Sequence, residues 1–444
     1  MNDDIIVAIT TSRLMAAISM LRISGTGSID FVQKFFSGNI KDKASHTITY
    51  GYLKDKSEIV DEVMVSIFRG KRSFTGEEMV EISCHGGVYI TTKVLELCIK
   101  CGARMAEPGE FSKRAFLNGR IDLSQAEAIS DLISAKSSYG ANIAMQGIQG
   151  SIKHFVEDLK EALIQIITQI EVNIDYPEYD DIEQLTSDKL LKESHHLQNK
   201  MKMILEDSKN VKLLKDGIQT VIIGRPNVGK SSLLNALLKE DKAIVTNIAG
   251  TTRDIVEGQV KIDDLILNII DTAGIRKTDD IVENIGVQKA KELIPQANLV
   301  LLVLDGSMPL QAEDYQLLEQ TKDSQRIIVI NKTDLNQVID IDGIKISAMS
   351  QDVLKLTQEI KKLFNLGKIL DHSTDILTNT RQTSILHKAS AYLQQAIVAM
   401  EEGIPADLVV EDLYACWLQL KEILGQQAKE DLLDELFKRF CIGK

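Results

Sequence analysis

Between Thr220 and Ser231 the chain reads Thr-Val-Ile-Ile-Gly-Arg-Pro-Asn-Val-Gly-Lys-Ser, and an apolar helical run follows at residues 232–238. A short strand, a G-x-x-x-x-G-K-S loop and a helix in this order predict a phosphate-binding loop (P-loop). The glycines let backbone N–H groups turn toward phosphate oxygens, and the helix N-terminus adds partial positive charge. We expect Lys230 to reach the β- and γ-phosphates of a nucleotide and Ser231 to ligate Mg²⁺.

Further segments at the right order and spacing make a chance match untenable. Asp271-Thr272-Ala273-Gly274 follows the apolar strand 265–270, where an aspartate can hold Mg²⁺ through water and a glycine can sense the γ-phosphate. Asn331-Lys332-Thr333-Asp334 follows another strand, 327–330. These three segments together resemble the GTPase superfamily. In that superfamily the aspartate matching Asp334 accepts hydrogen bonds from the guanine N1–H and amino group, so the resemblance implies specificity for GTP.

The catalytic machinery departs from the Ras pattern. Ile275 follows Gly274, where a Ras-like protein places the glutamine that orients the attacking water. An apolar side chain cannot orient water, and another group must also replace the arginine finger that neutralises charge between the β- and γ-phosphates. Asn227 and the segment 246–254, Thr-Asn-Ile-Ala-Gly-Thr-Thr-Arg-Asp, resemble the potassium-activated GTPases.

That resemblance assigns roles residue by residue. The K⁺ ligands would be Asn227 with oxygens of Thr246, Ile248 and Thr251, and Thr252 would complete the Mg²⁺ shell. Glu283 matches the glutamate that orients the hydrolytic water, although a lone glutamate at a helix start is usually a capping residue. We predict that Glu283→Ala lowers hydrolysis with little loss of GTP binding. The full set of expected GTP-contacting residues is Asn227, Val228, Gly229, Lys230, Ser231, Ser232, Thr246, Asn247, Ile248, Ala249, Gly250, Thr251, Thr252, Asp271, Thr272, Ala273, Gly274, Asn331, Lys332, Asp334, Ser347, Ala348 and Met349.

Outward from this site the pattern of predicted helices and strands changes twice along the chain. Short apolar strands alternate with helical segments from about residue 219 to 364, which is typical of a parallel sheet covered on both faces. Long helical stretches occupy about 124–214, interrupted near 175–181, and helical texture resumes from 364 to 440. Within the first stretch, five residues share one helix face and predict bundle packing: Val156, Leu159, Leu163, Ile167 and Ile170. One helical domain, discontinuous in sequence, therefore hosts an inserted α/β domain.

The first 118 residues have a different pattern. Short β-branched runs at 5–10, 20–23, 63–68 and 79–83 mix with a helical stretch at 89–100, which indicates an α+β domain. Cys98-x-x-Cys101 lacks the second pair that a zinc site needs, so we interpret it as the end of that helix, with Gly102 as the C-terminal cap.

Composition limits the partners and the compartment. The 444 residues include 51 Lys and Arg against 64 Asp and Glu, a formal net charge of −13. Such a surface repels a polyanion overall, so an RNA partner would need a local basic patch or a second protein. No stretch approaches the roughly 20 apolar residues of a membrane span, and no secretory signal is expected at the N-terminus. The five cysteines are a sparse, odd set that fits a reducing compartment, so we expect a cytoplasmic protein without a membrane partner.

Motifs outside the P-loop segments identify a narrower family. The N-terminal part contains Leu-Arg-Ile-Ser-Gly at 21–25, Ser-Phe-Thr-Gly-Glu at 73–77, Glu81 before His85-Gly86-Gly87, and Pro-Gly-Glu-Phe-Ser at 108–112; the chain ends in Cys441-Ile442-Gly443-Lys444. These motifs, which span almost the whole chain, resemble the MnmE (TrmE) family of tRNA uridine-modification GTPases. Residues 10–18 depart from the Pro- and Gly-rich segment usual there.

The resemblance implies a multidomain fold. Residues 1–118 would form a folate-binding-like α+β domain that also mediates dimerisation, and 119–216 with 367–444 the discontinuous helical domain. Residues 217–366 would form an inserted Ras-like α/β GTPase domain. The expected folate site comprises Arg22, Glu81, Arg120 and Lys444, and would take 5-formyltetrahydrofolate or a related tetrahydrofolate. Cys441 is a candidate nucleophile for one-carbon transfer, and an unreactive thiol packed beside Phe440 is the alternative.

The function implied is K⁺-dependent GTP hydrolysis by a homodimer. With an FAD-containing, MnmG-like partner in a heterotetramer, it would drive addition of a carboxymethylaminomethyl or aminomethyl group to the wobble uridine of certain tRNAs. A ribosome-assembly GTPase switch is one alternative, although this chain has a single Asn-Lys-x-Asp motif and no second G domain. A folate-sensing regulator without catalytic output is another.

Overall fold

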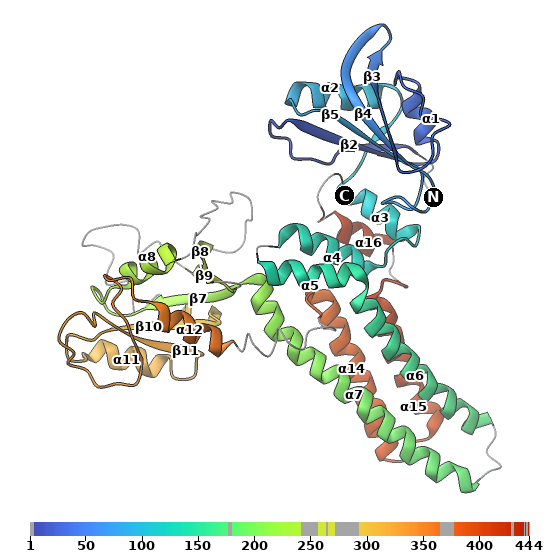
Figure 1. The fold of residues 1–444 in the computed structure, drawn as a ribbon. Helices are drawn as coiled ribbons and strands as arrows, with labels where there is room; N and C mark the ends of the chain where they lie inside the picture. Colours follow the sequence, from blue (N-terminus) through green and yellow to red (C-terminus); the bar gives the residue numbers. More distant parts are fainter. Residues whose placement is uncertain are drawn as a thin grey trace. The chain divides into compact units, whose positions relative to one another are not determined.

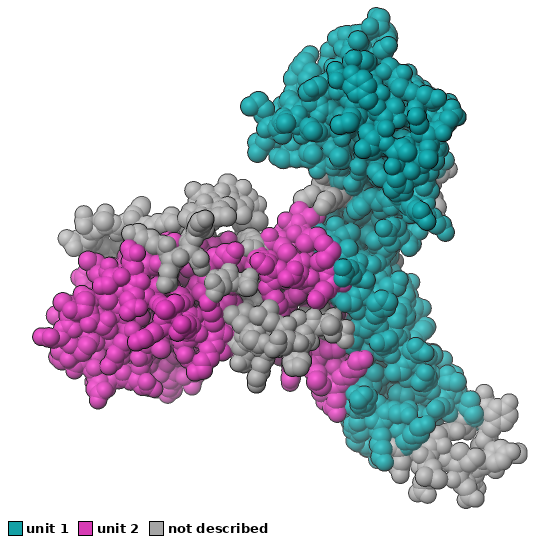
Figure 2. Space-filling model, viewed as in Figure 1, with its two compact units in different colours: residues 1–130, 147–197, 388–444 teal, residues 131–146, 198–387 magenta. Residues whose placement is uncertain are grey.

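The computed structural model describes residues 4–135, 137–175, 180–240, 256–262, 265–270, 293–364, 377–427, 430–438, 440 and 443. They form two compact units (Figure 2). Unit 1 comprises Met1–Ser130, Gly147–Leu197 and Lys388–Lys444, and unit 2 comprises Asp131–Gln146 and Gln198–His387.

Unit 1 begins with a six-stranded sheet in the order β3-β4-β5-β2-β1-β6 (Figure 1). Its pairs are antiparallel except for the parallel pair β1–β6. The strands predicted near 5–10, 20–23, 63–68 and 79–83 are confirmed, whereas β3 was not predicted. The bounds are β1 Ile6–Ile9, β2 Ile18–Ser24, β3 Thr47–Asp55, β4 Glu58–Phe68, β5 Met79–His85 and β6 Arg104–Met105.

Alternation along these strands separates the two faces of the sheet. Leu21, Val80 and Leu95 belong to one apolar cluster that joins one face to helices α1 (Ser28–Gln33) and α2 (Val88–Lys100). A smaller cluster on the other face contains Ile6 and Phe111, the latter from α3 (Glu110–Leu117). Helix α2 ends as predicted, with Gly102 at φ +113° just beyond it.

Helices make up most of the rest of unit 1, and four of them, α4, α5, α7 and α14, also have residues in unit 2. Helix α6 packs along α15 (Figure 1), and the predicted stripe from Val156 to Ile170 is buried, with no member more than 5% exposed. Helix α7 begins at Asp180 after α6 ends at Asp175, which confirms the predicted interruption. No described helix is both long and apolar enough to cross a membrane. The bounds are α4 Leu123–Ser134, α5 Ser138–Gln149, α6 Ser151–Asp175, α7 Asp180–Asp216, α14 Thr380–Glu401, α15 Ala406–Ile423 and α16 Glu430–Phe437.

Unit 2 contains a second six-stranded sheet, in the order β12-β11-β10-β7-β9-β8. The expectation of a wholly parallel sheet is wrong at one edge, where β8 pairs antiparallel with β9. Only two residues separate these strands, enough for an antiparallel hairpin but too few for the crossover that a parallel pair needs. The bounds are β7 Ile218–Ile223, β8 Val256–Ile262, β9 Leu265–Ile270, β10 Leu299–Asp305, β11 Arg326–Asn331 and β12 Ile344–Lys345.

Both faces of this sheet are covered, as predicted. Strand β10 is buried throughout, and its residues alternate between two apolar clusters. Leu301 and Val303 join α8 (Lys230–Glu240) and α12 (Leu354–Leu363) on one face. Leu302 and Leu304 join Leu317 of α11 (Ala312–Gln320) on the other. The carboxyl ends of β7, β10 and β11 consequently meet at one edge, where α/β folds bind ligands.

Candidate functional site

The P-loop connects the end of β7 to the start of α8. Three of its residues have positive φ: Gly224 at 156°, Asn227 at 62° and Gly229 at 97°. A Cβ on Gly224 would lie 2.3 Å from the carbonyl oxygen of Val303, and one on Gly229 would lie 2.2 Å from Nδ2 of Asn331. Only glycine fits these two close approaches. Repeated turns of this kind direct successive N–H groups into one concavity, which suits a phosphate chain.

Lys230 lies across this concavity. Its ammonium group donates to the carbonyl oxygens of Gly224, at 2.9 Å, and Arg225, at 2.7 Å. It is the first residue of α8, so its charge adds to the positive end of the helix dipole. Ser231, the expected Mg²⁺ ligand, follows it in the first turn of α8. The residues present therefore fit a nucleoside triphosphate with Mg²⁺.

Asn331 joins three loops through one side-chain amide. Its Nδ2 donates to the carbonyl of Val228 in the P-loop at 2.8 Å. Its Oδ1 accepts from the backbone N–H of Ala348 at 3.0 Å. The side chain is 2% exposed, so both bonds are shielded from water. The predicted base-contacting segments and the P-loop thus form one connected site, a role for Asn331 that motif matching did not reveal.

The last of these loops orients Asp334, the aspartate predicted to bind guanine. Ser347 donates its hydroxyl to Oδ1 of Asp334 at 2.7 Å, and the backbone N–H of Thr333 donates to the carbonyl of Ile346 at 3.1 Å. Asp334 is exposed, and Met349 beyond it is 80% exposed. The carboxylate is therefore held in place but accessible, as an acceptor for a purine edge must be.

Lys332 anchors the same segment to the end of β10. Its backbone is left-handed, at φ 64°, and its ammonium group lies 2.6 Å from Oδ2 of Asp305. Burial would raise the pKa of Asp305, but hydrogen bonds from Lys332 and Ser307 outweigh it and hold this pKa below its usual value. The ion pair persists at neutral pH and fixes the loop that carries Asp334.

Several predicted site residues lie outside the described residues. The structure therefore leaves their assignments as predictions: Thr246, Asn247, Ile248, Ala249, Gly250, Thr251, Thr252, Asp271, Thr272, Ala273, Gly274, Glu283, Cys441 and Lys444.

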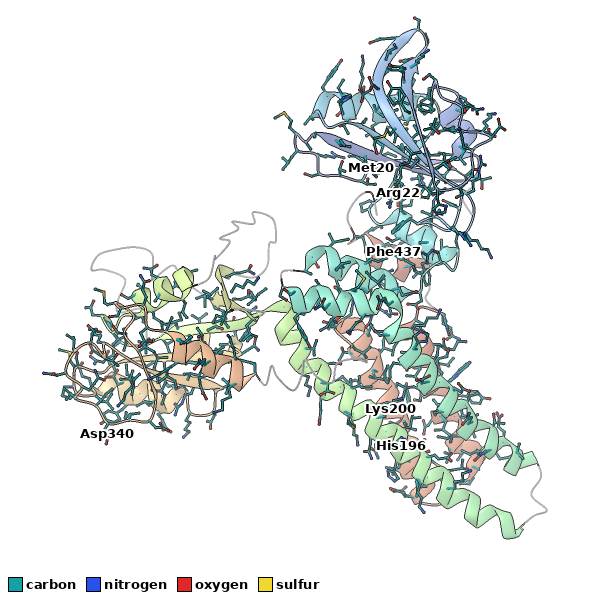
Figure 3. All side chains as sticks on the ribbon, viewed as in Figure 1. Met20, Arg22, His196, Lys200, Asp340 and Phe437 are labelled. Atoms are coloured by element: carbon teal, nitrogen blue, oxygen red, sulfur yellow. The ribbon has the colours of Figure 1, made fainter. Side chains whose placement is uncertain are left out.

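In unit 1, two of the predicted folate residues are partners across strands. Arg22 on β2, labelled in Figure 3, lies in register with Glu81 on β5. Its guanidinium donates to Oε1 of Glu81 through Nε at 2.9 Å and Nη2 at 2.8 Å. The guanidinium lies 4.5 Å from the ring centre of Phe74 and 5.7 Å from that of Phe111. A half-buried cation among aromatic rings can receive an anionic or aromatic ligand.

Arg120 borders the same part of the unit. It is exposed, and its Cβ lies 3.4 Å from the place a Cβ would occupy on Gly76. Asn118 donates to the carbonyl of Thr75 at 2.8 Å and fixes this approach. Arg22 thus contacts the segment 73–77 through Phe74, and Arg120 lies near it at Gly76.

A charged network that the sequence reasoning missed supports that segment. Arg114, 8% exposed, bonds Oδ1 of Asp4 at 2.6 Å and Oε1 of Glu77 at 3.2 Å. Arg104 binds both Asp4 and Glu110. Burial would raise the pKa of Asp4, but the two arginines outweigh it and hold that pKa below its usual value. The signal was present in the Glu-Phe-Ser-Lys-Arg run at 110–114, but the partners are distant in sequence.

Two family models match most of the chain. Residues 5–120 match the model described as the GTP-binding protein TrmE N-terminus, and residues 123–441 match that of the MnmE helical domain. The chain belongs to the MnmE family. A protein of Lactococcus lactis subsp. cremoris named tRNA modification GTPase MnmE is 46% identical to this chain. The match covers 99% of this chain and 98% of the relative. In Streptococcus sanguinis the identity is 46%, covering 99% of each chain, and in Staphylococcus haemolyticus it is 43%, covering 100% of each.

Membership of the MnmE family confirms the family and fold class predicted from the motifs. With its P-loop and the oriented Asp334, this MnmE-family chain is a GTPase.

The end of this MnmE-family chain lies against its N-terminal sheet. A Cβ on Gly443 would lie 2.7 Å from the carbonyl oxygen of Ile9, and one on Gly109 would lie 2.2 Å from that of Phe437. Gly443 immediately precedes Lys444, the predicted folate residue, which lies outside the described residues.

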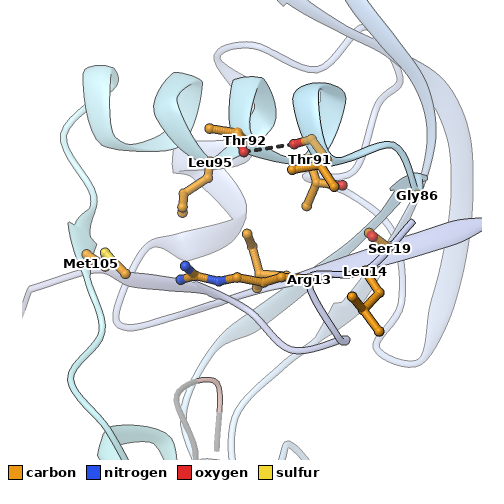
Figure 4. A pocket seen from close by; sticks show the side chains of 10 residues that line it. Arg13, Leu14, Ser19, Gly86, Thr91, Thr92, Leu95 and Met105 are labelled. Atoms are coloured by element: carbon orange, nitrogen blue, oxygen red, sulfur yellow. Dashed lines mark hydrogen bonds between the residues drawn. The ribbon is translucent and has the colours of Figure 1, made fainter. Parts of the chain in front are cut away.

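The segment that departs from the MnmE-family pattern lines a pocket of about 300 Å³ (Figure 4). Arg13 and Leu14 contribute from that segment, and Thr91 and Leu95 from α2. Leu95 belongs to the apolar cluster on the α2 face of the sheet, whereas Arg22 faces Phe74 and Phe111. The unusual residues therefore line a pocket on the face away from Arg22.

Proposed function

We propose that this GTPase acts in tRNA modification as a potassium-dependent enzyme. Its MnmE-family relatives are named tRNA modification GTPases and match the chain from end to end. In the proposed reaction, GTP hydrolysis in a homodimer drives addition of a carboxymethylaminomethyl or aminomethyl group to the wobble uridine of certain tRNAs. An FAD-containing, MnmG-like partner would complete a heterotetramer in the cytoplasm.

The connection of three loops through Asn331 is the observation that best supports the proposed GTP site. Because one amide holds the P-loop to the segment after Asp334, the phosphate cradle and the guanine acceptor keep a fixed separation. Binding a rigid purine nucleotide across such a site costs little reorganisation. Lys230 would bind the phosphates, and Asp334 would select guanine over adenine.

Asn227 supports the potassium dependence. It takes a left-handed backbone conformation in the P-loop, and its side chain is exposed. A short amide in this conformation can present its oxygen toward a bound cation. With Thr246, Ile248 and Thr251, Asn227 would hold a K⁺ ion, and Ser231 with Thr252 would hold Mg²⁺. When bound, these cations would offset the negative charge that develops on the phosphates during hydrolysis.

The folate part rests on Arg22, Glu81, Arg120 and Lys444. Glu81 is oriented by Arg22, and a carboxylate can accept the paired N–H and amino groups of a pterin edge. Arg22, over the ring of Phe74, and Arg120, near Gly76, would supply positive charge for the anionic glutamyl part of a tetrahydrofolate. Cys441 would lie within three residues of Lys444, so a covalent role in one-carbon transfer is part of the proposal.

GTP hydrolysis in potassium buffer and in sodium buffer, at equal ionic strength, tests the proposal first. We expect strong stimulation by potassium in the natural chain and a loss of about 100-fold in the stimulated rate for Asn227→Ala. ATP is the substrate control and should not be hydrolysed. Equal slow rates in both buffers would contradict the potassium site and favour a regulatory switch.

Loss of the modified wobble uridine in cells lacking the chain separates tRNA modification from ribosome assembly. Nucleoside mass spectrometry of total tRNA provides this measurement, with ribosome profiles as the comparison. If the Cys441→Ser variant restores the modification in those cells, a covalent role of the thiol is excluded.

A further inference from the structure

Arg225, the second residue of the P-loop, is a buried cation. The residue is 8% exposed, and its Nε donates to Oδ2 of Asp314 at 2.7 Å. The Asp314 side chain is 1% exposed and lies in the first turn of α11. Both residues belong to unit 2. A desolvated ion pair of this kind is no more stabilising than apolar residues of similar volume, so it needs another explanation.

Capping of α11 does not account for the pair. Asp314 and Gln311 form a capping box, in which the backbone N–H of Gln311 donates to Oδ2 of Asp314 at 2.9 Å. That bond needs only one acceptor at the helix start, and exposed Glu or Gln residues serve equally well. Oδ1 of Asp314 has no hydrogen-bond partner among the described residues. The buried carboxylate of Asp314 therefore pairs with Arg225 through Oδ2, although its other oxygen has no hydrogen-bond partner among the described residues.

The main chain of Arg225 connects this ion pair to the phosphate-binding lysine. Its carbonyl accepts from Nζ of Lys230 at 2.7 Å, and Pro226, which follows, has a fixed φ. Gly224 is confined by the carbonyl of Val303, and Val228 is tied to Asn331. Arg225 is thus the anchor between these two points, and its planar, rigid group suits that task better than lysine would.

We propose that Arg225 and Asp314 are a positioning pair for nucleotide binding. Through α11 the pair holds the first half of the P-loop in the conformation that presents Lys230 to the phosphates. Neither side chain touches the nucleotide, so the effect is exerted through the backbone of Arg225. The inference rests on the proposed GTP site and adds to it the residues that set its affinity.

Binding of a fluorescent GDP analogue to the full-length chain tests the pair. Asp314→Asn removes a charge with little change in shape and retains an acceptor for the Gln311 N–H, whereas Arg225→Gln removes the charge and shortens the side chain. We expect each single variant to bind GDP about 10- to 100-fold more weakly, because a small displacement of the P-loop misplaces Lys230. The double variant should bind no more weakly than either single variant, since the two residues act as a unit.

Controls separate positioning from stability. Preference for GDP over ADP should be unchanged in all variants, because Asp334 is held by Ser347 and not by α11. Lys322→Gln, which removes an exposed ion pair with Glu319, is the matched control and should bind GDP normally. Arg225→Lys should recover only part of the affinity, because lysine lacks the planar donor group.

Three results would contradict the proposal that Arg225 and Asp314 position the P-loop. Unchanged GDP affinity with a lowered unfolding temperature would show a purely structural role. Independent, multiplying losses in the double variant would show that the residues do not act together. Failure of the natural chain itself to bind GDP would remove the GTP site, a result distinct from failure of the variants alone. If Arg225→Gln does not fold, Asp314→Asn carries the same test.

Discussion

At the scale of single residues, Asn331 has the greatest leverage on the nucleotide site. Replacing it with alanine removes the bond to Val228 and the bond from Ala348 together. We expect Asn331→Ala to bind GDP about 10- to 100-fold more weakly. Because the buried partners are left unpaired, the free energy of unfolding should fall by about 1–3 kcal/mol.

Titration of GDP and denaturant unfolding measure these two effects of Asn331→Ala. Asn336→Ala is the matched control, because that side chain lies in an exposed stretch of the same loop. Normal GDP affinity in Asn331→Ala would mean that the loops keep their places without the amide.

His85 is a second residue whose behaviour follows from one contact. Its Nδ1 lies 2.7 Å from Oδ1 of Asp61, whose side chain is 8% exposed, and this hydrogen bond and charge raise the pKa of His85 above its usual value of 6.5. A raised folded-state pKa means that the pair contributes its full stability below pH 6.5, and loses it as the pH rises through the folded-state pKa.

Titration of His85 by NMR checks that expectation. The midpoint should lie above 6.5 in the natural chain and return toward 6.5 in Asp61→Asn. A midpoint at or below 6.5 in the natural chain would contradict the ion pair.

At the scale of elements, the stripe on α6 supplies the clearest prediction. Leu163 is fully buried on α6, which packs along α15, so Leu163→Ala leaves a cavity. We expect the free energy of unfolding to fall by about 2–5 kcal/mol. Gln165→Ala on the exposed side of the same helix is the control and should change it little. Denaturant unfolding followed by circular dichroism measures both, and equal small effects would show that this face is not packed.

The helices and strands that were predicted are those whose apolar residues follow the burial of the element along its whole length. The apolar run of β10 and the stripe of α6 contact a core along their whole length, so their periodicity is complete. Strands β3 and β8 were missed because polar residues and Gly51 or Gly258 interrupt their alternation. They are outer strands of their sheets in the described residues, and a full ladder borders β3 on one side, since its other side forms an isolated bridge between Phe36 and Leu53.

The candidate site was predictable to the extent that its chemistry is local. Phosphate cradling depends on consecutive residues, so the P-loop was identified from sequence alone. Ties such as Arg225 to Asp314, 89 residues apart, or Asn331 to Val228, 103 residues apart, depend on which strand ends meet. No spacing along the chain specifies them.

At the scale of the whole molecule, the two proposed ligands belong to different compact units. The P-loop, Asn331 and Asp334 lie in unit 2, whereas Arg22, Glu81 and Arg120 lie in unit 1. A ligand stabilises the part of the chain that must be folded to bind it, by about 2.7 kcal/mol at a concentration 100 times its dissociation constant. Local opening of that part should slow accordingly.

Hydrogen exchange of the full chain, followed by mass spectrometry, can therefore assign each ligand to its unit. GDP should protect β7, α8 and β11, and leave β2 and β5 unchanged. 5-Formyltetrahydrofolate should protect β2 and β5, and Glu81→Gln should abolish that protection while leaving the GDP effect intact, because Gln cannot accept both donors of the pterin edge. Protection of β2 and β5 that survives in Glu81→Gln would place the folate elsewhere, and the pocket lined by Arg13 and Thr91 would be the next surface to test.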